Sequence, residues 1–301
     1  PSCEQLKLII EGYKMGSWDA FAENFDELLN EWNLFFFFLQ KTYIVKDVIR
    51  NDWIEVKDVI YKVEKNTGVD INYREVSVWE DGTQMVDANV DGVVYIKDGG
   101  KFYKMQVDDA INVKWLGAKG DGFSDDSNAF KLAVTFFENV YVPKGNYLCN
   151  FDLPRKINIK GDGSLYSRLI PKDQNKAVMT YKNSAPYWTF NTKIDGVGFW
   201  NANSDGSPKK TGVGFTFGYT NLDVPLQGTE FYTNVVFENC YFFGFEKAVL
   251  TPTGNIGVDF INCGGAGNKY AFYFMDARNF SEIMHAGCKT FYGGEFSGND
   301  I

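Results

Sequence analysis

The sequence predicts a mainly β protein in which a helical rod and a small β region precede a solenoid of parallel strands. Three features predict this fold: a heptad-like pattern from Trp18 to Val63, a strand–glycine turn–helix unit at Asn112–Val134, and a 23-residue offset between Val235–Cys240 and Val258–Cys263. With 301 residues, the chain is long enough for a large core and an extended piece. We expect helical structure over residues 1–68, a β collar over 69–110 and the solenoid over 111–301.

The N-terminal region carries the heptad-like pattern. Along spacings of three and four residues, twelve of fourteen positions are apolar and the spacing does not slip. A pattern of about seven heptads predicts a coiled coil, with a rod about 70 Å long. Thr42 and Lys46 interrupt the seam, and a break near residues 39–43 would give a helical hairpin within one chain instead. The oligomer interface expected on this seam consists of Trp18, Phe21, Phe25, Leu28, Trp32, Phe35, Leu39, Ile49, Trp53, Val56, Ile60 and Val63.

A run of four phenylalanines lies within this region. Phe35 belongs to the seam, whereas Phe36, Phe37 and Phe38 would point outward from a coil of two or three strands. Exposed apolar clusters usually mark a contact, so we expect these three residues to dock onto another protein of an assembly. A second helix from the same chain is the alternative cover, and the sequence leaves both open.

The region from Glu75 to Val107 contains short β-type runs separated by Asp-Gly and Gly-Gly turns. This alternation is typical of a hairpin or meander and predicts the small collar. The acidic turns lack the ligand spacing of an EF-hand, so the sequence predicts no metal site there.

The run Asn112–Val134 passes from an apolar stretch through a glycine turn into a helix predicted near residues 124–138. Ser124 is the expected N-cap, and Asp125 and Asp126 would lie in the first turn, at the positive end of the helix dipole. A phosphate loop is disfavoured because the glycines are followed by Phe123, Ser124 and two aspartates rather than a Lys-Ser/Thr pair.

The 23-residue offset between the sequences VVFENC and VDFINC predicts consecutive coils of a solenoid. Stacked coils would bring Phe237 onto Phe260 inside the solenoid, and Asn239 onto Asn262 at a turn. The offset continues downstream, and weaker echoes appear near Ile194 and Phe291. Solenoid sequence runs to the last residues without a polar cap, as expected where further coils follow, but the sequence does not decide whether the chain continues past Ile301.

The strand–GAKGDG–DD–helix unit at Asn112–Val134 resembles the entry cap of the pectate-lyase-like parallel β-helices of phage tailspikes and other glycan-acting proteins. The stretches VYVPKGNY at Val140–Tyr147 and INIKGDGSLYSRLIP at Ile157–Pro171 resemble the first coils that follow that cap. The resemblance covers the chain from about Ile111 onward. It implies a right-handed parallel β-helix, of the pectin-lyase-like kind, in a phage tail appendage. It also implies a homotrimer whose N-terminus meets other tail or collar proteins, and whose β-helix meets a bacterial surface polysaccharide. We therefore expect a virion protein that is assembled in the host cytoplasm and acts at the host cell surface.

Composition narrows the expected partners. The formal net charge of −9 argues against nucleic acid, which calls for basic patches. The longest apolar run, Leu34–Leu39, is far shorter than the roughly 20 residues of a membrane-spanning helix, and the N-terminus lacks a signal-peptide pattern. The five cysteines form no CxxC pair, so we expect no cofactor, no zinc site and a reduced, buried pair at Cys240 and Cys263.

Two carboxylates are the expected catalytic pair if the protein cleaves glycans, because glycoside hydrolysis commonly uses one acid and one base or nucleophile. In the repeat alignment Asp195 and Glu238 are equivalent, so both would lie on one outer face. A lyase would instead pair a base with Lys, Arg or a metal. Sugars also stack on aromatic rings, which makes Trp200, Tyr241 and Tyr270 glycan-binding candidates. A non-catalytic structural or adhesion protein of the phage tail remains the alternative, as does a purely solvated role for these carboxylates.

Overall fold

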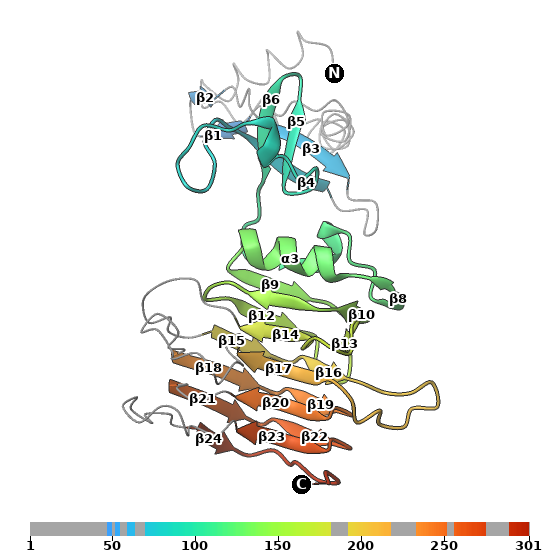
Figure 1. Cartoon of the computed structure of the whole chain (residues 1–301). Helices are drawn as coiled ribbons and strands as arrows, with labels where there is room; N and C mark the ends of the chain where they lie inside the picture. The colour runs from blue at the N-terminus through green and yellow to red at the C-terminus, as the bar shows by residue number, and fades with distance from the viewer. Residues whose placement is uncertain are drawn as a thin grey trace, which may run out of the picture. The chain divides into compact units, whose positions relative to one another are not determined.

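The computed structural model describes residues 47–49, 52–54, 59–63, 70–181, 192–217, 233–251, 256–274 and 289–300. The chain divides into two compact units, residues 1–106 and 107–301. Each unit is described by itself below (Figure 1).

The first unit is antiparallel β. A hairpin pairs β1 with β2, and a four-stranded sheet has the order β3–β4–β6–β5. One side of the sheet is buried through Ile71, Tyr73, Ile96, Tyr103 and Met105. The strands expected between residues 75 and 107 are therefore present, and the sheet extends further toward the N-terminus than the expected collar. The elements are β1 (Asp47–Ile49), β2 (Asp52–Ile54), β3 (Val59–Val63), β4 (Asp70–Val76), the 3-10 turn η2 (Asp87–Asn89), β5 (Tyr95–Asp98) and β6 (Lys101–Met105).

The helix predicted to continue to Val63 is contradicted at the described residues 47–49, 52–54 and 59–63, which are strands. Ile49, Trp53, Ile60 and Val63 lie in strands β1, β2 and β3 rather than on a helical seam. The physical reason is that β-branched and aromatic residues, as in the sequence VIYKV of β3, also suit a strand, and β4 supplies a partner that a single helix pattern does not anticipate. The other seam positions, from Trp18 to Leu39 together with Val56, and the docking candidates Phe36, Phe37 and Phe38, lie outside the described residues.

The second unit is a parallel β solenoid. Its described strands form a seven-stranded sheet (β24–β21–β18–β15–β12–β9–β7), a six-stranded sheet (β22–β19–β16–β13–β10–β8) and a five-stranded sheet (β11–β14–β17–β20–β23). Each coil adds one strand to each sheet, as β18, β19 and β20 do, and the coils stack one above another in Figure 1. The predicted parallel β-helix is confirmed.

These coils are built from short strands with tight turns. The entry elements are β7 (Ile111–Asn112), the 3-10 turn η3 (Val113–Leu116), β8 (Asp121–Asp125) and α3 (Ser127–Phe136). The coils contain β9 (Asn139–Val142), β10 (Gly145–Cys149), β11 (Phe151–Leu153), β12 (Asn158–Gly161), β13 (Ser167–Pro171), β14 (Met179–Tyr181), β15 (Thr192–Asp195), β16 (Gly198–Trp200), β17 (Val213–Phe217), β18 (Thr233–Glu238), β19 (Tyr241–Phe243), β20 (Lys247–Thr251), β21 (Ile256–Ile261), β22 (Gly264–Ala266), β23 (Tyr270–Phe274) and β24 (Lys289–Tyr292).

The start of the capping helix differs from its prediction. Asp125 lies in strand β8 and Asp126 is the N-cap, so neither lies in the first turn as predicted. Helix α3 begins at Ser127 with Asp126 at the N-cap, and Ser124 lies in strand β8, so Ser124 is not the cap. The buried Asp126 carboxylate instead accepts the backbone N–H groups of Lys119 (2.7 Å) and Gly120 (3.1 Å). The strand pairing of β8 with β10 delays the helix, and Asp126 ties the glycine turn to the helix start.

The 23-residue repeat is reproduced by the strand register. Val235, Phe237 and Glu238 on β18 pair with Val258, Phe260 and Ile261 on β21. The Phe237 and Phe260 rings stack at 5.1 Å between centroids, with an interplanar angle of 6°. Asn239 and Asn262 occupy matching left-handed turn positions, with φ of 52° and 51°. Asparagine tolerates this conformation better than most residues, which explains the repeated Asn.

The cysteines predicted to be reduced are free thiols in the structure. Cys240 and Cys263 are both buried and unpaired as disulfides. The Cys240 thiol lies 3.3 Å from the Ile194 carbonyl oxygen, and the Cys263 thiol lies 3.4 Å from that of Phe237. Burial raises the pKa of the Cys240 thiol, so it behaves as a packing group rather than as a nucleophile.

Candidate functional site

The outer face of the seven-stranded sheet brings the predicted catalytic carboxylates together. On β15, Thr192 and Ile194 are buried while Lys193 and Asp195 are partly exposed, as expected for a strand with one solvated face. Asp195 is in register with Glu238 on the next coil. The prediction that these two residues share an outer face is confirmed.

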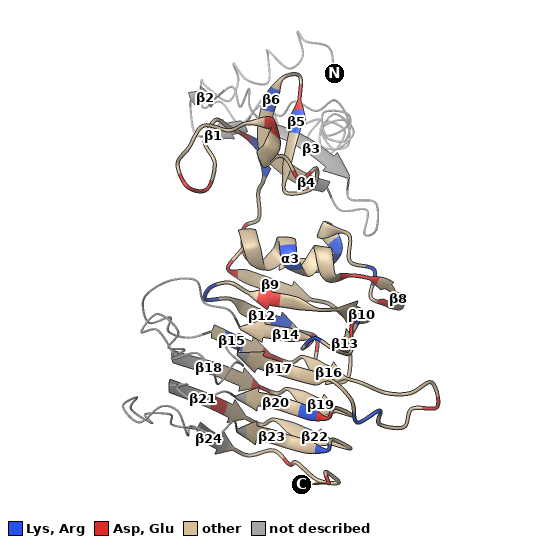
Figure 2. Ribbon diagram, viewed as in Figure 1, with Lys and Arg blue, Asp and Glu red and all other residues tan. Residues whose placement is uncertain are grey.

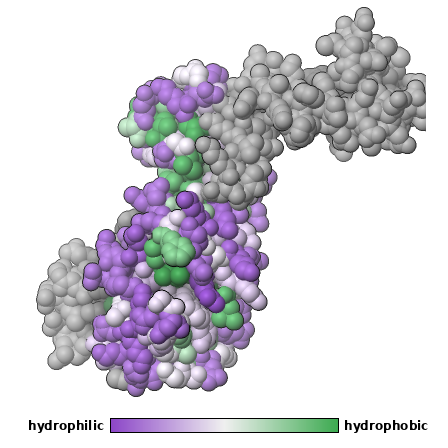
Figure 3. All heavy atoms as spheres, turned by 90° about the vertical axis from the view of Figure 1, so that its right-hand side faces the viewer, coloured by the Kyte–Doolittle hydropathy of each residue, from purple (hydrophilic) through white to green (hydrophobic). Residues whose placement is uncertain are grey.

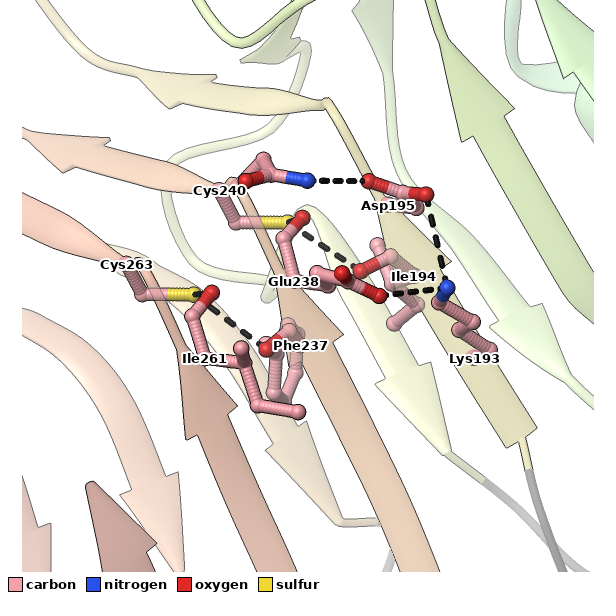
Figure 4. A network of polar contacts seen from close by, with 9 residues as sticks. Lys193, Ile194, Asp195, Phe237, Glu238, Cys240, Ile261 and Cys263 are labelled. Atoms are coloured by element: carbon pink, nitrogen blue, oxygen red, sulfur yellow. Dashed lines mark hydrogen bonds and ion pairs between the residues drawn. The ribbon is translucent and has the colours of Figure 1, made fainter. Parts of the chain in front are cut away.

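Lys193 bridges the two carboxylates (Figure 4). Its Nζ lies 3.5 Å from Asp195 Oδ2 and makes a shorter contact with Glu238 Oε2. On the other side of the site, the Asn239 side-chain amide donates a 2.9 Å hydrogen bond to Asp195 Oδ1. The left-handed backbone of Asn239, at the turn directly after β18, places this amide beside Asp195. Four side chains from neighbouring coils therefore form one connected polar cluster.

The charges within this cluster are mutually stabilised but solvated. The hydrogen bond with Glu238, followed by the charge of Asp195, raises the pKa of Lys193, so its ammonium stays protonated. The side chains of Lys193, Asp195 and Glu238 are 45%, 24% and 29% exposed. Solvent screening at such exposure limits a typical ion pair to about 1 kcal/mol or less. The cluster therefore contributes little to the stability of the fold. Its partly exposed side chains are accessible to a ligand.

The geometry of the carboxylates bears on the chemistry that they could perform. Adjacent parallel strands lie about 4.8 Å apart, and Asp195 and Glu238 stand directly opposite each other on such strands. Retaining glycosidases place their carboxyl groups about 5–5.5 Å apart, whereas inverting enzymes need about 6.5–9.5 Å. The arrangement is closer to the retaining spacing.

The cluster belongs to a longer row of outward-facing positions along the solenoid axis. Strand register places Lys160 next to Asp195 on one side, and Ile261 followed by Tyr292 next to Glu238 on the other. Lys160 is exposed, and Tyr292 is 60% exposed. Figure 2 shows acidic and basic residues interspersed along the solenoid rather than segregated by sign. The row offers charged, hydrogen-bonding and aromatic groups to an extended ligand.

The three aromatic candidates do not form one site. Trp200 on β16 and Tyr241 on β19 are neighbours on the six-stranded sheet, with centroids 6.1 Å apart. Tyr270 lies on β23 of the five-stranded sheet, where Lys269 sits 5.3 Å from its ring. The candidates therefore occupy two different faces of the solenoid.

Trp200 is also less available for stacking than its sequence position suggests. Its ring stacks on Phe243 at 4.5 Å, and the guanidinium of Arg168 lies 4.3 Å from its centroid. Because β13 and β19 flank β16 on opposite sides, the two partners cover opposite faces of the indole. A sugar could reach only the edge of the ring.

Sequence reasoning found the carboxylate pair but missed the residues that organise it. Lys193 shares the outward phase of its strand with Asp195, two residues later, so period-2 alternation was an available signal. Asn239 was read as part of a turn ladder, and its bond to Asp195 crosses from one coil to another without a local sequence signal.

Metal and membrane features add nothing to this site. Among the residues that the structure describes, no group of three or more His, Cys, Asp or Glu side chains is placed to hold a metal ion. No described helix is both long and apolar enough to cross a membrane.

Comparison with known proteins agrees with the architecture. Residues 110–241 match the family model described as rhamnogalacturonase A/epimerase, pectate lyase-like. The solenoid is a parallel β-helix, and its residues 110–241 are similar to that pectate-lyase-like family. The enzymatically active domain of tailspike protein 2 from bacteriophage CBA120 matches with a TM-score of 0.51 at 17% identity, over 76% of this chain and 34% of that chain. This level of similarity indicates a shared fold.

Two further proteins are similar to this chain, one with a lower TM-score and one over a short stretch of sequence. The surface adhesin PfbA of Streptococcus pneumoniae matches with a TM-score of 0.39 at 19% identity, over 53% of this chain and 39% of that chain. An uncharacterised 65.4 kDa protein in the cps region of Klebsiella pneumoniae is 41% identical over 59 residues, which are 20% of this chain and 10% of that protein. The chain thus spans about a third of the tailspike structure and a tenth of the curated relative.

Proposed function

We propose that this chain belongs to a phage tail appendage of the tailspike or receptor-binding kind, whose pectate-lyase-like β-helix binds and depolymerises a bacterial surface polysaccharide. The observation that carries the proposal is the in-register pair Asp195 and Glu238 on an outer face of the β-helix, bridged by Lys193. The shared fold with a phage tailspike supports the setting in a virion tail. Assembly in the host cytoplasm is consistent with the buried free thiols.

The row along the seven-stranded sheet supports binding of a polymer that lies along the solenoid axis. Lys160 lies beside Asp195, and Tyr292 lies two coils from Glu238 beyond Ile261, so sugar units along the polymer would meet a cation and an aromatic ring. A flat aromatic face matches the C–H face of a pyranose, and the exposed carboxylates and ammonium can hydrogen-bond its hydroxyl groups.

For cleavage, the close spacing of the pair favours a retaining displacement. One carboxylate would attack the anomeric carbon while the other, as the acid, donates a proton to the leaving oxygen. Water then attacks the glycosyl–enzyme intermediate, with the second carboxyl group taking a proton from the water. Lys193 acts as a positioning residue, since it holds both carboxylates, and substrate must loosen its contact with whichever one serves as the acid.

The test is incubation of the purified chain with a panel of capsular, O-antigen and teichoic-type polymers, with assays for reducing ends and for unsaturated products. We expect new reducing ends on one class of polymer, and a loss of at least about 100-fold in rate for Asp195→Asn or Glu238→Gln. Asp152→Asn is the matched control, because Asp152 is an exposed strand carboxylate on the five-stranded sheet. Full cleavage by Asp195→Asn or Glu238→Gln would refute the site, and unsaturated products would indicate a lyase.

A non-catalytic adhesion or structural role is the second candidate function. The Lys193 bridge favours it, because the ammonium already contacts both carboxylates and an arrangement that is satisfied internally can hold a sugar by hydrogen bonds without chemistry. Polymer that binds without being cleaved, with binding weakened by Asp195→Asn, would support adhesion. Absence of both binding and cleavage across the panel would overturn the polysaccharide proposal.

The N-terminal region is proposed to assemble and attach the appendage. Its heptad residues before position 47 would form the core of a coiled coil, in a homotrimer, and Phe36–Phe38 would dock onto another tail or collar protein. Light scattering of the full chain should give a trimer mass, and Phe25→Asp should lower it. A monomeric mass for the full chain would indicate the intramolecular hairpin.

A further inference from the structure

Arg168 on β13 holds an unusual position on the outer face of the six-stranded sheet. Its guanidinium carbon lies 4.3 Å from the centroid of the Trp200 ring on the next coil. Trp200 in turn stacks on Phe243, one coil further along, with an interplanar angle of 24°. Arg168 therefore lies beside the stacked rings of Trp200 and Phe243.

Within the described part of the chain, no group accepts a hydrogen bond from the Arg168 guanidinium. Its Nε is buried and has no hydrogen-bond partner, and the described residues provide no carboxylate within ion-pair distance. Arg155, the other arginine with a buried unpartnered Nε, differs because its Nη2 donates to the Thr135 carbonyl oxygen at 3.1 Å. Among the described residues, the polar environment of Arg168 therefore consists of its contact with the Trp200 ring.

Stacking and hydrogen bonding use different parts of a guanidinium. The guanidinium carbon lies over the indole. Because Nε is buried, the terminal Nη groups are the donors that remain to meet an acceptor. A planar fork of donors matches the paired oxygens of a carboxylate or phosphate. Strand register adds two polar neighbours in the same row, with Asn146 beside Arg168 and Tyr241 two coils away across Gly198.

We propose that Arg168, pinned against Trp200, binds the anionic substituent of an acidic sugar, a carboxylate or a phosphate. This inference rests on the proposed polysaccharide ligand and adds its chemical class. The net charge of −9 means that the protein as a whole does not attract anions, so a local cation must capture the acidic group. The subsite lies on a different sheet from the Asp195–Glu238 pair, which makes it a recognition site separate from the proposed chemistry.

A side view of the solenoid, turned to the side where β8 and β10 lie in Figure 1, shows mostly hydrophilic surface with small separate apolar clusters (Figure 3). The six-stranded sheet nevertheless carries Trp200 and Phe243 in its stacked column. A polar ligand with an apolar ring face, such as a sugar, suits a surface that mixes a cation, aromatic edges and hydrogen-bonding groups.

The test follows the Nε–H resonance of Arg168 by NMR in full-length protein with labelled arginine. A buried Nε–H exchanges slowly with water, so its resonance can be observed. The probes are sodium glucuronate, glucose 6-phosphate and glucose. We expect a saturable shift with at least one of the two anions and none with glucose. The anion that saturates at the lower concentration identifies the group as carboxylate or phosphate.

Variants assign the signal and control for folding. Arg168→Lys should remove the resonance and weaken binding of the preferred anion at least tenfold, as measured from the ligand signals by saturation transfer. Arg155→Lys makes the same change at an arginine with a protein acceptor and should leave that binding unchanged. Equal shifts with glucose, no shift with any probe, or full binding by a folded Arg168→Lys variant would overturn the proposal.

The two proposals fail in different ways. If no polymer in the panel is bound, the proposed function fails, while the monosaccharide titration still reports on Arg168. If a polymer is bound or cleaved but neither anion perturbs Arg168, only the anionic subsite fails.

Discussion

The β-helix and the N-terminal unit differ in that a periodic sequence pattern predicts the strand pairing of the β-helix correctly, but does not predict the strands of the N-terminal unit. In the β-helix, residues that repeat after 23 positions occupy the same place on consecutive coils, as Phe237 and Phe260 do. In the N-terminal unit, the apolar spacing of three and four residues continues to Val63, yet β3 pairs as a strand with β4. A sequence repeat therefore predicts structure reliably when each copy pairs with the neighbouring copy. An apolar spacing alone does not identify the partner.

The largest effect should come from breaking the internal aromatic ladder. Phe237→Ala removes a fully buried ring that stacks on Phe260 at 5.1 Å and meets Phe215 edge-on at 4.8 Å. Such truncations cost about 3–5 kcal/mol because they combine lost burial with a cavity. Urea unfolding of the full chain, followed by far-UV circular dichroism, measures the loss.

Phe123→Ala is the matched control, because Phe123 is a phenylalanine of the same β-helix with 87% exposure. It should change stability by less than about 0.5 kcal/mol. Equal destabilisation by both variants would mean that the repeated ladder does not carry the stability of the β-helix.

The next effect distinguishes a repeated turn from a loop outside the repeat. Gly244 and Gly206 have nearly the same backbone, with φ of +80° and +83°. A Cβ on Gly244 would lie 2.0 Å from the Asn201 carbonyl oxygen, whereas nothing lies within 4 Å of a Cβ on Gly206. The left-handed backbone should lower the free energy of unfolding of both alanine variants by about 1 kcal/mol. The close contact should lower that of Gly244→Ala by about 1–3 kcal/mol more.

Thermal unfolding of the two variants side by side gives this difference. Because the backbone term is common to both, the difference isolates the packing of one coil against the next. Similar melting temperatures would show that the coil relaxes away from the added methyl group.

The parts of the molecule that sequence predicted are those with a local or repeated signal. The glycine turn, the coil stacking and the equivalence of Asp195 with Glu238 all have such a signal. The Arg168–Trp200 contact has none, since β13 and β16 pair across a coil whose length differs from the 23-residue repeat. The Lys193–Glu238 contact is likewise set by three-dimensional register, because the two residues are far apart in sequence.

A third prediction concerns a turn interaction in the N-terminal unit. The Asp91 carboxylate accepts the backbone N–H groups of Val93 and Val94, both at 2.7 Å, and of Tyr95 at 3.2 Å. Asp91→Ala leaves these donors without their acceptor and should cost about 1–2 kcal/mol, less than the ladder variant. Amide hydrogen exchange at Val94 and Tyr95 measures the local loss.

Asp98→Ala is the control, since Asp98 is an exposed carboxylate at the end of β5 in the same unit. It should leave exchange at Val94 unchanged. Equal exchange rates in the two variants would mean that Asp91 does not stabilise this turn. The protection of Val94 and Tyr95 would then come from strand pairing.

The smallest effect is a pH dependence at the entry cap, a feature that the coils do not repeat. Burial raises the pKa of Asp126 above its ordinary value of 3.8, although the hydrogen bonds from Lys119 and Gly120 oppose this shift. Ionisation is then harder in the folded chain than in the unfolded chain. The stability that Asp126 contributes is present below pH 3.8 and is lost as the pH rises through its folded pKa. Asp126→Asn should remove this slope, as read from melting temperatures of both proteins between about pH 3 and pH 6.5.

Asp205→Asn provides the opposite sign in the same experiment. Hydrogen bonds from Ser207 lower the pKa of the exposed Asp205, so its contribution appears above the unfolded pKa and is lost as the pH falls. The difference between wild type and variant should therefore shrink with rising pH for Asp126 and grow for Asp205. A difference that grows with pH for Asp126 as well would mean that its two backbone hydrogen bonds outweigh its burial. The cap carboxylate would then act as an anchor for the glycine turn at neutral pH, rather than as a buried charge that the fold tolerates.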